Sequence, residues 1–217
     1  LTTPSLADLE GEVGRDLFGM SASSSVGGGA RARISGPIVQ GKLGATASYA
    51  IEDTPGFIDN SVSGAKDQNG FRQQSARLGF FWKPSDDLSV KLNALYQRIN
   101  ADGDANVALD STTLQPLDGR RSDNNLTDQP FEKKIQYYSL NIDDSLPWAD
   151  LVSASTFTNT WTSQVQDASY TYGVSFPFFG LPAGASQYHY NLHLEKYTQE
   201  LRLQSHPGVR LDVGHWS

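Results

Sequence analysis

Hydrophobic and polar residues alternate with a period of two along most of this 217-residue chain. A two-residue period places side chains alternately on the two faces of a β-strand, whereas a helix repeats about every 3.6 residues. The clearest candidate strands are residues 30–38, 43–53, 75–82, 88–97, 137–143 and 197–205, and weaker candidates are residues 7–14, 151–163 and 209–216. The pattern therefore predicts an all-β protein with eight full strands and the start or whole of a ninth.

The segment YTQELRLQS, residues 197–205, combines leucine with charged residues in one strand. Its two faces carry Tyr197, Leu201 and Leu203 on one side and Thr198, Glu200, Arg202 and Gln204 on the other. A soluble sandwich would turn the polar face to bulk water, whereas a membrane barrel would turn it to its lumen. In the barrel, Gln199 falls on the lipid side, and we expect it near the extracellular end, where headgroups tolerate an amide.

The connections between the candidate strands alternate between long and short. The long ones are about residues 15–28, 54–70, 100–134 and 164–195, and the short ones are about residues 39–42, 83–87, 144–149 and 206–208. Soluble sandwiches have no reason to follow this alternation. Outer-membrane barrels do, because short turns lie at the periplasmic rim and long loops lie outside the cell. The alternation favours an antiparallel up-and-down transmembrane β-barrel.

The aromatic residues support the same architecture. Trp82 and Trp148 flank predicted short turns, and Tyr49 and Tyr96 lie on apolar faces near the opposite ends of their strands. Indole and phenol rings settle at the headgroup level of a membrane, where they form two girdles around a barrel. Packing across the strands of a soluble sheet would explain any one of these residues, but not their placement at strand ends.

Composition excludes several classes of protein. No stretch approaches the roughly 18 consecutive apolar residues of a membrane helix. The formal charge is −7 and basic residues are not clustered, which argues against a nucleic-acid partner. The absence of cysteine excludes disulfides and thiolate chemistry. The chain begins with Leu1 and shows no signal peptide, so we expect a processed form or part of a longer protein.

Five segments of the chain follow one another in a characteristic order: GPIVQGKLGATASYAIEDTPGFIDN (36–60), WKPSDDLSVKLNALYQ (82–97), LQPLDG (114–119), WADLVSASTF (148–157) and EKYTQELRLQS (195–205). In this order they resemble segments of TonB-dependent outer-membrane receptors of the iron complex receptor type. The resemblance implies that residues 1–217 are the N-terminal portion of a barrel of about 22 strands. By this resemblance, we expect the plug domain, the TonB box and the C-terminal barrel strands of that family to lie outside these residues.

The resemblance also implies a function and a location. Receptors of this family are active importers in the outer membrane of Gram-negative bacteria. They are not enzymes, and they need no cofactor. The implied partners are the TonB-ExbB-ExbD complex, reached through the absent plug region, outer-membrane lipid or lipopolysaccharide, and a small ligand such as a ferric siderophore. The sequence does not identify the substrate, which is a siderophore-like metal chelate or another bulky nutrient.

Two sets of residues are candidates for contact with ligand or plug. The predicted extracellular loop at 170–190 is rich in aromatic residues, which mark binding surfaces when they are exposed; these are Tyr170, Tyr172, Phe176, Phe178, Phe179, Tyr188 and Tyr190. The predicted lumen-facing charges, which we expect to contact the plug or an anionic ligand, are Arg31, Arg33, Arg77, Lys91, Glu200 and Arg202. Packing of the aromatic loop within the barrel mouth is the alternative to ligand binding.

A calcium site is a weaker candidate. Asp102, Asp104 and Asn106 have the spacing of a calcium-binding loop, and Asp110 falls at its ninth position. Val107 and Thr113 stand where such a loop needs glycine and glutamate, so a solvated, turn-rich loop is the preferred interpretation. We therefore predict no metal site and no catalytic group.

Two other functions are compatible with the sequence. A self-contained small outer-membrane barrel could act as a pore or an adhesin, and it would end in a strand with a terminal aromatic residue, close to the position of Trp216. A soluble β-sandwich could bind sugars through the aromatic loop.

Overall fold

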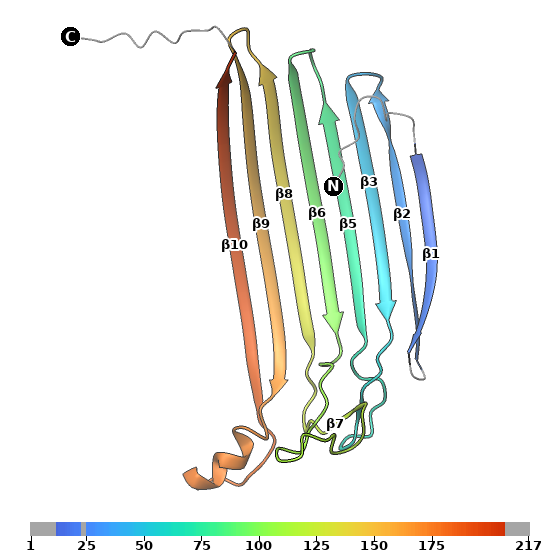
Figure 1. Ribbon diagram of the computed structural model, residues 1–217, viewed down its shortest axis with the longest axis vertical. Coiled ribbons are helices and arrows are strands. Elements are labelled where there is room, and N and C mark those ends of the chain that lie inside the picture. Colours follow the sequence, from blue (N-terminus) through green and yellow to red (C-terminus); the bar gives the residue numbers. More distant parts are fainter. Residues whose placement is uncertain (1–11, 23–24, 207–217) are drawn as a thin grey trace, which may run out of the picture.

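The computed structural model describes residues 12–22 and 25–206, and its main feature is one eight-stranded antiparallel sheet (Figure 1). Neighbours in the chain are neighbours in the sheet, in the order β1-β2-β3-β5-β6-β8-β9-β10. The strands are β1 (Glu12–Ala22), β2 (Ser25–Val39), β3 (Leu43–Thr54), β5 (Phe71–Trp82), β6 (Leu88–Ala101), β8 (Phe131–Ser145), β9 (Ala149–Asp167) and β10 (Gln187–Ser205). The predicted up-and-down antiparallel architecture is confirmed.

The sheet is open, with β1 and β10 at its two edges. All eight strands run side by side along the long axis of the molecule, and the two edge strands lie on opposite sides of the view in Figure 1. The described strands therefore form a section of wall and do not close on themselves. A self-contained small barrel requires the first and last strands to pair, so the described residues do not support that alternative.

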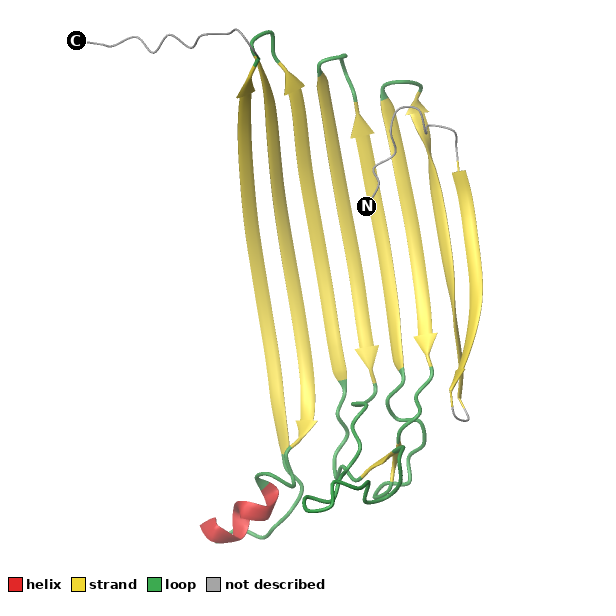
Figure 2. Cartoon of the chain, viewed as in Figure 1, coloured by secondary structure: helices red, strands yellow, loops and turns green. Residues whose placement is uncertain are grey.

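Short turns gather at one end of the sheet and long loops at the other (Figure 2). We call the first end the turn edge; its connections are residues 40–42, 83–87 and 146–148. The opposite end is the loop edge, with connections 55–70, 102–130 and 168–186. The turn after β2 depends on Gly41, whose φ of 70° is a left-handed conformation that glycine adopts without strain.

Two of the predicted long loops had wrong boundaries. Residues 15–28 are not a long loop, because β1 and β2 occupy all of this range except 23–24, which lies outside the described residues. The predicted loop 164–195 is shorter at both ends, since β9 continues to Asp167 and β10 starts at Gln187. The candidate strand 209–216, most of 7–14 and most of the turn 206–208 lie outside the described residues.

The long loops form a small unit of their own. β4 (Asp59–Asn60) pairs in parallel with β7 (Ser122–Asp123), which joins loop 55–70 to loop 102–130. Loop 168–186 contains the 3-10 helix η2 (Gly173–Phe179), drawn in red in Figure 2. Within the part of the chain that the structure describes, no helix is long and apolar enough to cross a membrane.

The eight-stranded sheet lacks a protein core. Among the described residues, the buried hydrophobic side chains are Ile58 and Ala168 in the loops and Ala149 at the start of β9. Large apolar residues are instead exposed on one face of the sheet, which we call the outer face. One row of directly opposed residues crosses this face from β2 to β10: Ile34, Ala47, Leu78, Ala94, Tyr138, Phe157 and Tyr197.

An exposed apolar face of this extent is typical of a surface that meets lipid rather than water. A soluble sandwich would cover it with a second sheet, and the described residues form no such sheet. Tyr138 and Phe157 stack with ring centroids 6.4 Å apart, and the rings of Phe157 and Tyr197 are tilted against each other at 6.2 Å, so aromatic side chains follow one another across three strands as in an aromatic girdle. The structure thus favours the membrane-barrel interpretation over the soluble one.

Gln199 lies further from the loop edge than expected. Its side chain is on the outer face as predicted, opposite Ser155, but it lies six residues before Ser205, where β10 reaches the turn edge. That is about 20 Å along a strand, so Gln199 lies within the apolar band and not near the loop edge. Its amide is satisfied locally, because Ser155 donates to its oxygen and its nitrogen donates to Ser153 Oγ at 3.1 Å.

Candidate functional site

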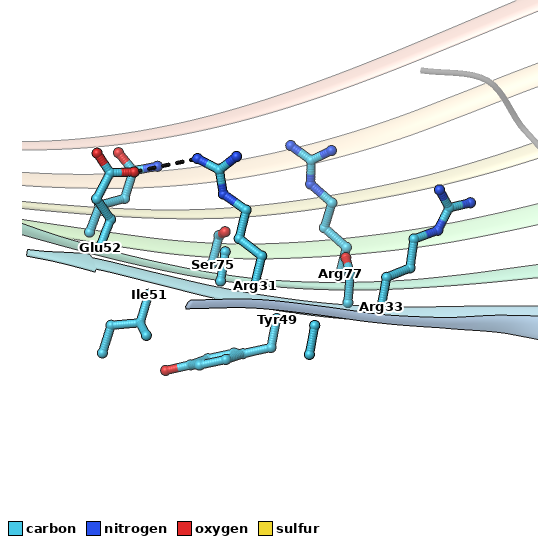
Figure 3. A pocket seen from close by; sticks show the side chains of 11 residues that line it. Arg31, Arg33, Tyr49, Ile51, Glu52, Ser75 and Arg77 are labelled. Atoms are coloured by element: carbon cyan, nitrogen blue, oxygen red, sulfur yellow. Dashed lines mark ion pairs between the residues drawn. The ribbon is translucent and has the colours of Figure 1, made fainter. Parts of the chain in front are cut away.

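The face opposite to the apolar band, here called the inner face, is hollowed and polar. Its cavity is lined by Arg33 and Arg77 together with neutral residues of β3, β6 and β8, among them Ser48, Asn93, Leu95, Tyr137 and Ser139. Figure 3 shows Arg31, Arg33 and Arg77 projecting from this face, while Tyr49 and Ile51 point to the other side. The alternation read from the sequence places these side chains on the face predicted for them.

Three of the predicted inner-face cations form ion pairs with carboxylates. Arg31 lies 3.6 Å from Glu52, and Lys91 lies 3.4 Å from Asp143 and 6.0 Å from the ring of Phe81. Arg202 lies 2.5 Å from Glu200, two residues away on β10. These partly exposed pairs contribute little to stability, about 0–1 kcal/mol each, so their main effect is on the charge of the inner face.

Arg33 and Arg77 stand on either side of Ser48 in one row across β2, β3 and β5. Two strand spacings put their backbones about 10 Å apart. Neither has a carboxylate within salt-bridge distance among the described residues. They give the inner face local positive charge although the chain as a whole carries −7.

The aromatic loop is divided between two locations. Tyr188 and Tyr190 belong to β10, opposite Gln166 and Gln164 of β9, and not to the loop. Phe178 and Phe179 lie at the end of η2 and are 89% and 78% exposed. Tyr172 is exposed, whereas Phe176 is half-buried. The predicted cluster is therefore an exposed tip on η2 together with two tyrosines on the inner face of the wall.

Tyr170 has a structural contact that the sequence did not predict. Its hydroxyl donates to the carbonyl oxygen of Asn124 at 3.1 Å, across to loop 102–130. Asp167, the last residue of β9, connects both loops, since it accepts from the backbone of Leu126 and of Thr127, the latter at 3.0 Å, and from the backbone of Ser169 at 2.7 Å. The three long loops thus form one connected layer over the loop edge.

Asp123 is the centre of the junction between the first two long loops. It is 2% exposed, and its Oδ2 accepts from Gln68 at 2.5 Å and Asn125 at 2.8 Å, while Oδ1 has no hydrogen-bond partner. Burial raises the pKa of this carboxyl above its ordinary value, since an apolar environment disfavours the charged form. By contrast, Lys66 lies 2.7 Å from Asp59 and lowers the pKa of that partly exposed carboxyl.

The calcium candidate does not assemble. Asp110 Oδ1 is occupied by the backbone N–H groups of Thr112 and Thr113, at 3.0 Å and 2.7 Å, which also lower its pKa. Asn106 and Asp104 contact each other at 3.5 Å. Across residues 12–22 and 25–206, no three acidic, histidine or cysteine side chains are grouped as metal ligands. Asp104, Asn106 and Asp110 lie in a part of loop 102–130 that contains several turns.

Sequence reasoning missed four inner-face residues, which are Lys133, Leu192, Leu194 and Lys196. Their face follows from the register, since Leu192 and Lys133 both lie opposite Thr162 of β9. Alternation would have found Leu192 and Leu194 if the strand had been started at Gln187 rather than near residue 196. Because the alternation of residues 151–163 is weak, the sequence did not show how this strand pairs with the strands before and after it.

The fold has a counterpart among solved structures. The ferric yersiniabactin uptake receptor FyuA from Yersinia pestis superposes with a TM-score of 0.67 over 92% of this chain, at 17% sequence identity. The chain spans 28% of the length of that receptor. No protein-family model matches the chain, and no curated protein matches it in sequence. At this identity the likeness establishes the fold alone, an antiparallel sheet that superposes on a section of that receptor.

Proposed function

We propose that this chain is part of the barrel wall of a TonB-dependent receptor in the outer membrane of a Gram-negative bacterium. The receptor imports a siderophore-like metal chelate and catalyses no reaction. The observation that carries the proposal is the single-layered sheet, with an apolar outer face, a polar inner face and long loops gathered at one edge. The similarity to a chelate receptor over most of the chain supports it.

Ligand enters at the loop edge, which in this orientation faces the cell exterior. The candidate contacts are the exposed aromatic side chains of loop 168–186, Tyr172, Phe178 and Phe179, with Tyr188 and Tyr190 below them. Aromatic rings bind the flat faces of ligands and lose little conformational entropy when they do so. Tyr170 and Phe176 support the loop, since one is hydrogen-bonded to Asn124 and the other is half-buried.

The inner-face charges contact a plug domain seated in the lumen, through which the TonB-ExbB-ExbD complex supplies energy. Arg33 and Arg77, which lack carboxylate partners among the described residues, are the best candidates for that contact, because a plug carboxylate would neutralise them. Arg31, Lys91, Glu200 and Arg202 are already paired within the wall and contribute hydrogen bonds at most. The outer face contacts lipid and lipopolysaccharide.

Uptake by whole cells tests this proposal. A strain lacking the gene is supplied with a panel of radiolabelled ferric siderophores under iron limitation, with and without a functional TonB. At least one chelate should accumulate only when both the gene and TonB are present, and restoring the gene should restore its uptake. Uptake of every chelate at wild-type rates in the deletion strain would contradict an import function.

A further inference from the structure

The polarity of β10 inverts along its length. Between Tyr197 and Leu203 the apolar side chains lie on the outer face, opposite Phe157 and Leu151. Towards the loop edge they lie on the inner face instead. The inner positions there are occupied by Tyr188, Tyr190, Leu192 and Leu194, which are 53%, 39%, 42% and 52% exposed, and the outer positions by His189, Asn191, His193 and Glu195.

The change from apolar to polar side chains on the outer face of β10 has a simple cause. β10 continues beyond the aromatic girdle at Tyr197, so its outer side chains leave the lipid and become polar. That cause does not explain why the inner side chains become apolar. A lumen filled with water favours polar side chains at these positions, so the series from Tyr188 to Leu194 indicates an apolar occupant.

Two lysines border this apolar series. Lys196 is the next inner residue after Leu194, and Lys133 lies in the row of Leu192, with Thr162 between them. Two strand spacings place Lys133 about 10 Å from Leu192. The same face of β8 carries Phe131 and Ile135, which extend the apolar surface around Lys133.

No carboxylate neutralises these lysines. Neither Lys133 nor Lys196 has an ion pair within the described ranges, and the inner residues opposite them on β9 are Thr162 and Thr158. The outer neighbour Lys134, in contrast, lies 3.2 Å from Glu132. Glu200, the nearest inner acid along β10, is bound to Arg202. The site therefore combines apolar surface with uncompensated positive charge.

We infer that the inner wall formed by Tyr190, Leu192, Leu194, Lys133 and Lys196 binds a ligand that carries net negative charge on a flat apolar body. A metal chelate with aromatic rings and anionic donor groups has this chemistry. The inference rests on the proposed function and adds the substrate class to it. Rings of the ligand pack on the tyrosine and leucines, and its anionic groups face the two lysines.

Two ferric chelates of opposite character test the substrate class. Ferric tris-catecholate is aromatic and trianionic, whereas ferric tris-acetohydroxamate is aliphatic and neutral. Binding of each is measured by equilibrium dialysis of radiolabelled iron against the full-length protein, purified in detergent. The catecholate should bind more tightly. Lys133→Gln and Lys196→Gln should each weaken it about three- to fivefold, and Leu192→Ser together with Tyr190→Ser about tenfold.

Matched controls lie on the outer face of the same strands. Lys134→Gln and His193→Ser should leave catecholate binding unchanged, and all variants should retain the urea midpoint of the wild type. Equal binding of the two chelates, no binding of either, or equal losses in the inner and outer variants would overturn the inference. Such a result leaves the receptor proposal intact if deletion of the gene still abolishes uptake of another chelate, so the two failures can be told apart.

Discussion

Gln68 donates a hydrogen bond of 2.5 Å to Asp123, and this contact joins two loops whose residues are 55 positions apart in the chain. The bond lies beside the parallel pairing of β4 with β7, in a setting where Asp123 is 2% exposed. The long loops therefore have internal structure of their own. They present a preorganised layer at the loop edge, and preorganisation reduces the entropy lost when a ligand binds.

The buried carboxyl makes this layer sensitive to pH. The pKa of Asp123 is raised in the folded loops by burial, with a further increase from Asp167, so its neutral form is favoured there. The stabilisation that the Asp123 carboxyl gives to the folded loops is fully present below the pKa that it has in the unfolded chain. This stabilisation is lost as the pH rises through the pKa that it has in the folded loops. Hydrogen exchange at residues 56–61 and 121–125, corrected for intrinsic rates, should therefore accelerate as pH rises from below 4.

Asp123→Asn should abolish this acceleration, because an amide has the same shape and does not titrate. Any pH dependence of exchange that remains in this variant should have the opposite sign, with faster exchange at lower pH. The reason is that Lys66 lowers the pKa of Asp59, so stabilisation by that carboxyl is lost as pH falls. Asp59→Asn is the control for this second effect. Unchanged acceleration in Asp123→Asn would show that another group is responsible.

Asn69 should be essential to loop 55–70. Its side-chain oxygen accepts from the backbone of Phe57 at 2.7 Å and of Ile58 at 2.8 Å, and Ile58 is 2% exposed. Asn69→Ala leaves these donors without a partner, which costs about 1–3 kcal/mol for each that stays buried. We expect rapid cleavage of this loop by added protease. Asn69→Asp keeps the acceptor and should be cleaved more slowly than Asn69→Ala; equal rates would contradict this role.

A charged substitution should destabilise the protein more on the outer face than on the inner face. Leu92 lies on the outer face in the row of Phe80 and Leu140, and Asn93 is its inner neighbour. Leu92→Lys should destabilise the protein in lipid vesicles by up to about 2–4 kcal/mol, the penalty that lysine has at the bilayer midplane and that falls towards the interfaces. Asn93→Lys should cost about 1 kcal/mol, for the lost hydrogen bond to Ser139. Urea unfolding from vesicles measures both, and similar losses would contradict the assignment of the faces.

Gln199 and Ser155 should be energetically coupled. Ser155 donates to the Gln199 amide within the apolar band, so Ser155→Ala should destabilise the wild type and have little effect in Gln199→Leu. A double-mutant cycle should give a coupling of about 0.6 kcal/mol, the average for hydrogen bonds between membrane segments. Thr156, which faces inward and contacts Thr198, provides the control, because Thr156→Ala should not couple to Gln199. Additive effects at Ser155 and Gln199 would refute the interaction.

Two parts of the predicted site were decided by tertiary structure. Arg33 and Arg77 could be placed on one face from alternation, but their proximity depends on the register of β2, β3 and β5. Tyr170 looked like a member of the ligand-binding cluster, yet its hydroxyl contacts Asn124 of another loop. Local periodicity carries no information on pairing between segments that are distant in the chain, so neither relationship could be predicted.

The sequence by itself determined the class of fold, the two faces of most strands and the alternation of long loops with short turns after β2. These properties are local: a two-residue period fixes the face of each side chain, and Gly, Pro and Asp mark the turns. Only the tertiary structure decided that Gln199 lies within the apolar band and that Asp123 is buried between two loops. Each depends on strand register or on contacts between loops. These are stabilised by interactions between residues from different segments of the chain, so no single segment encodes them.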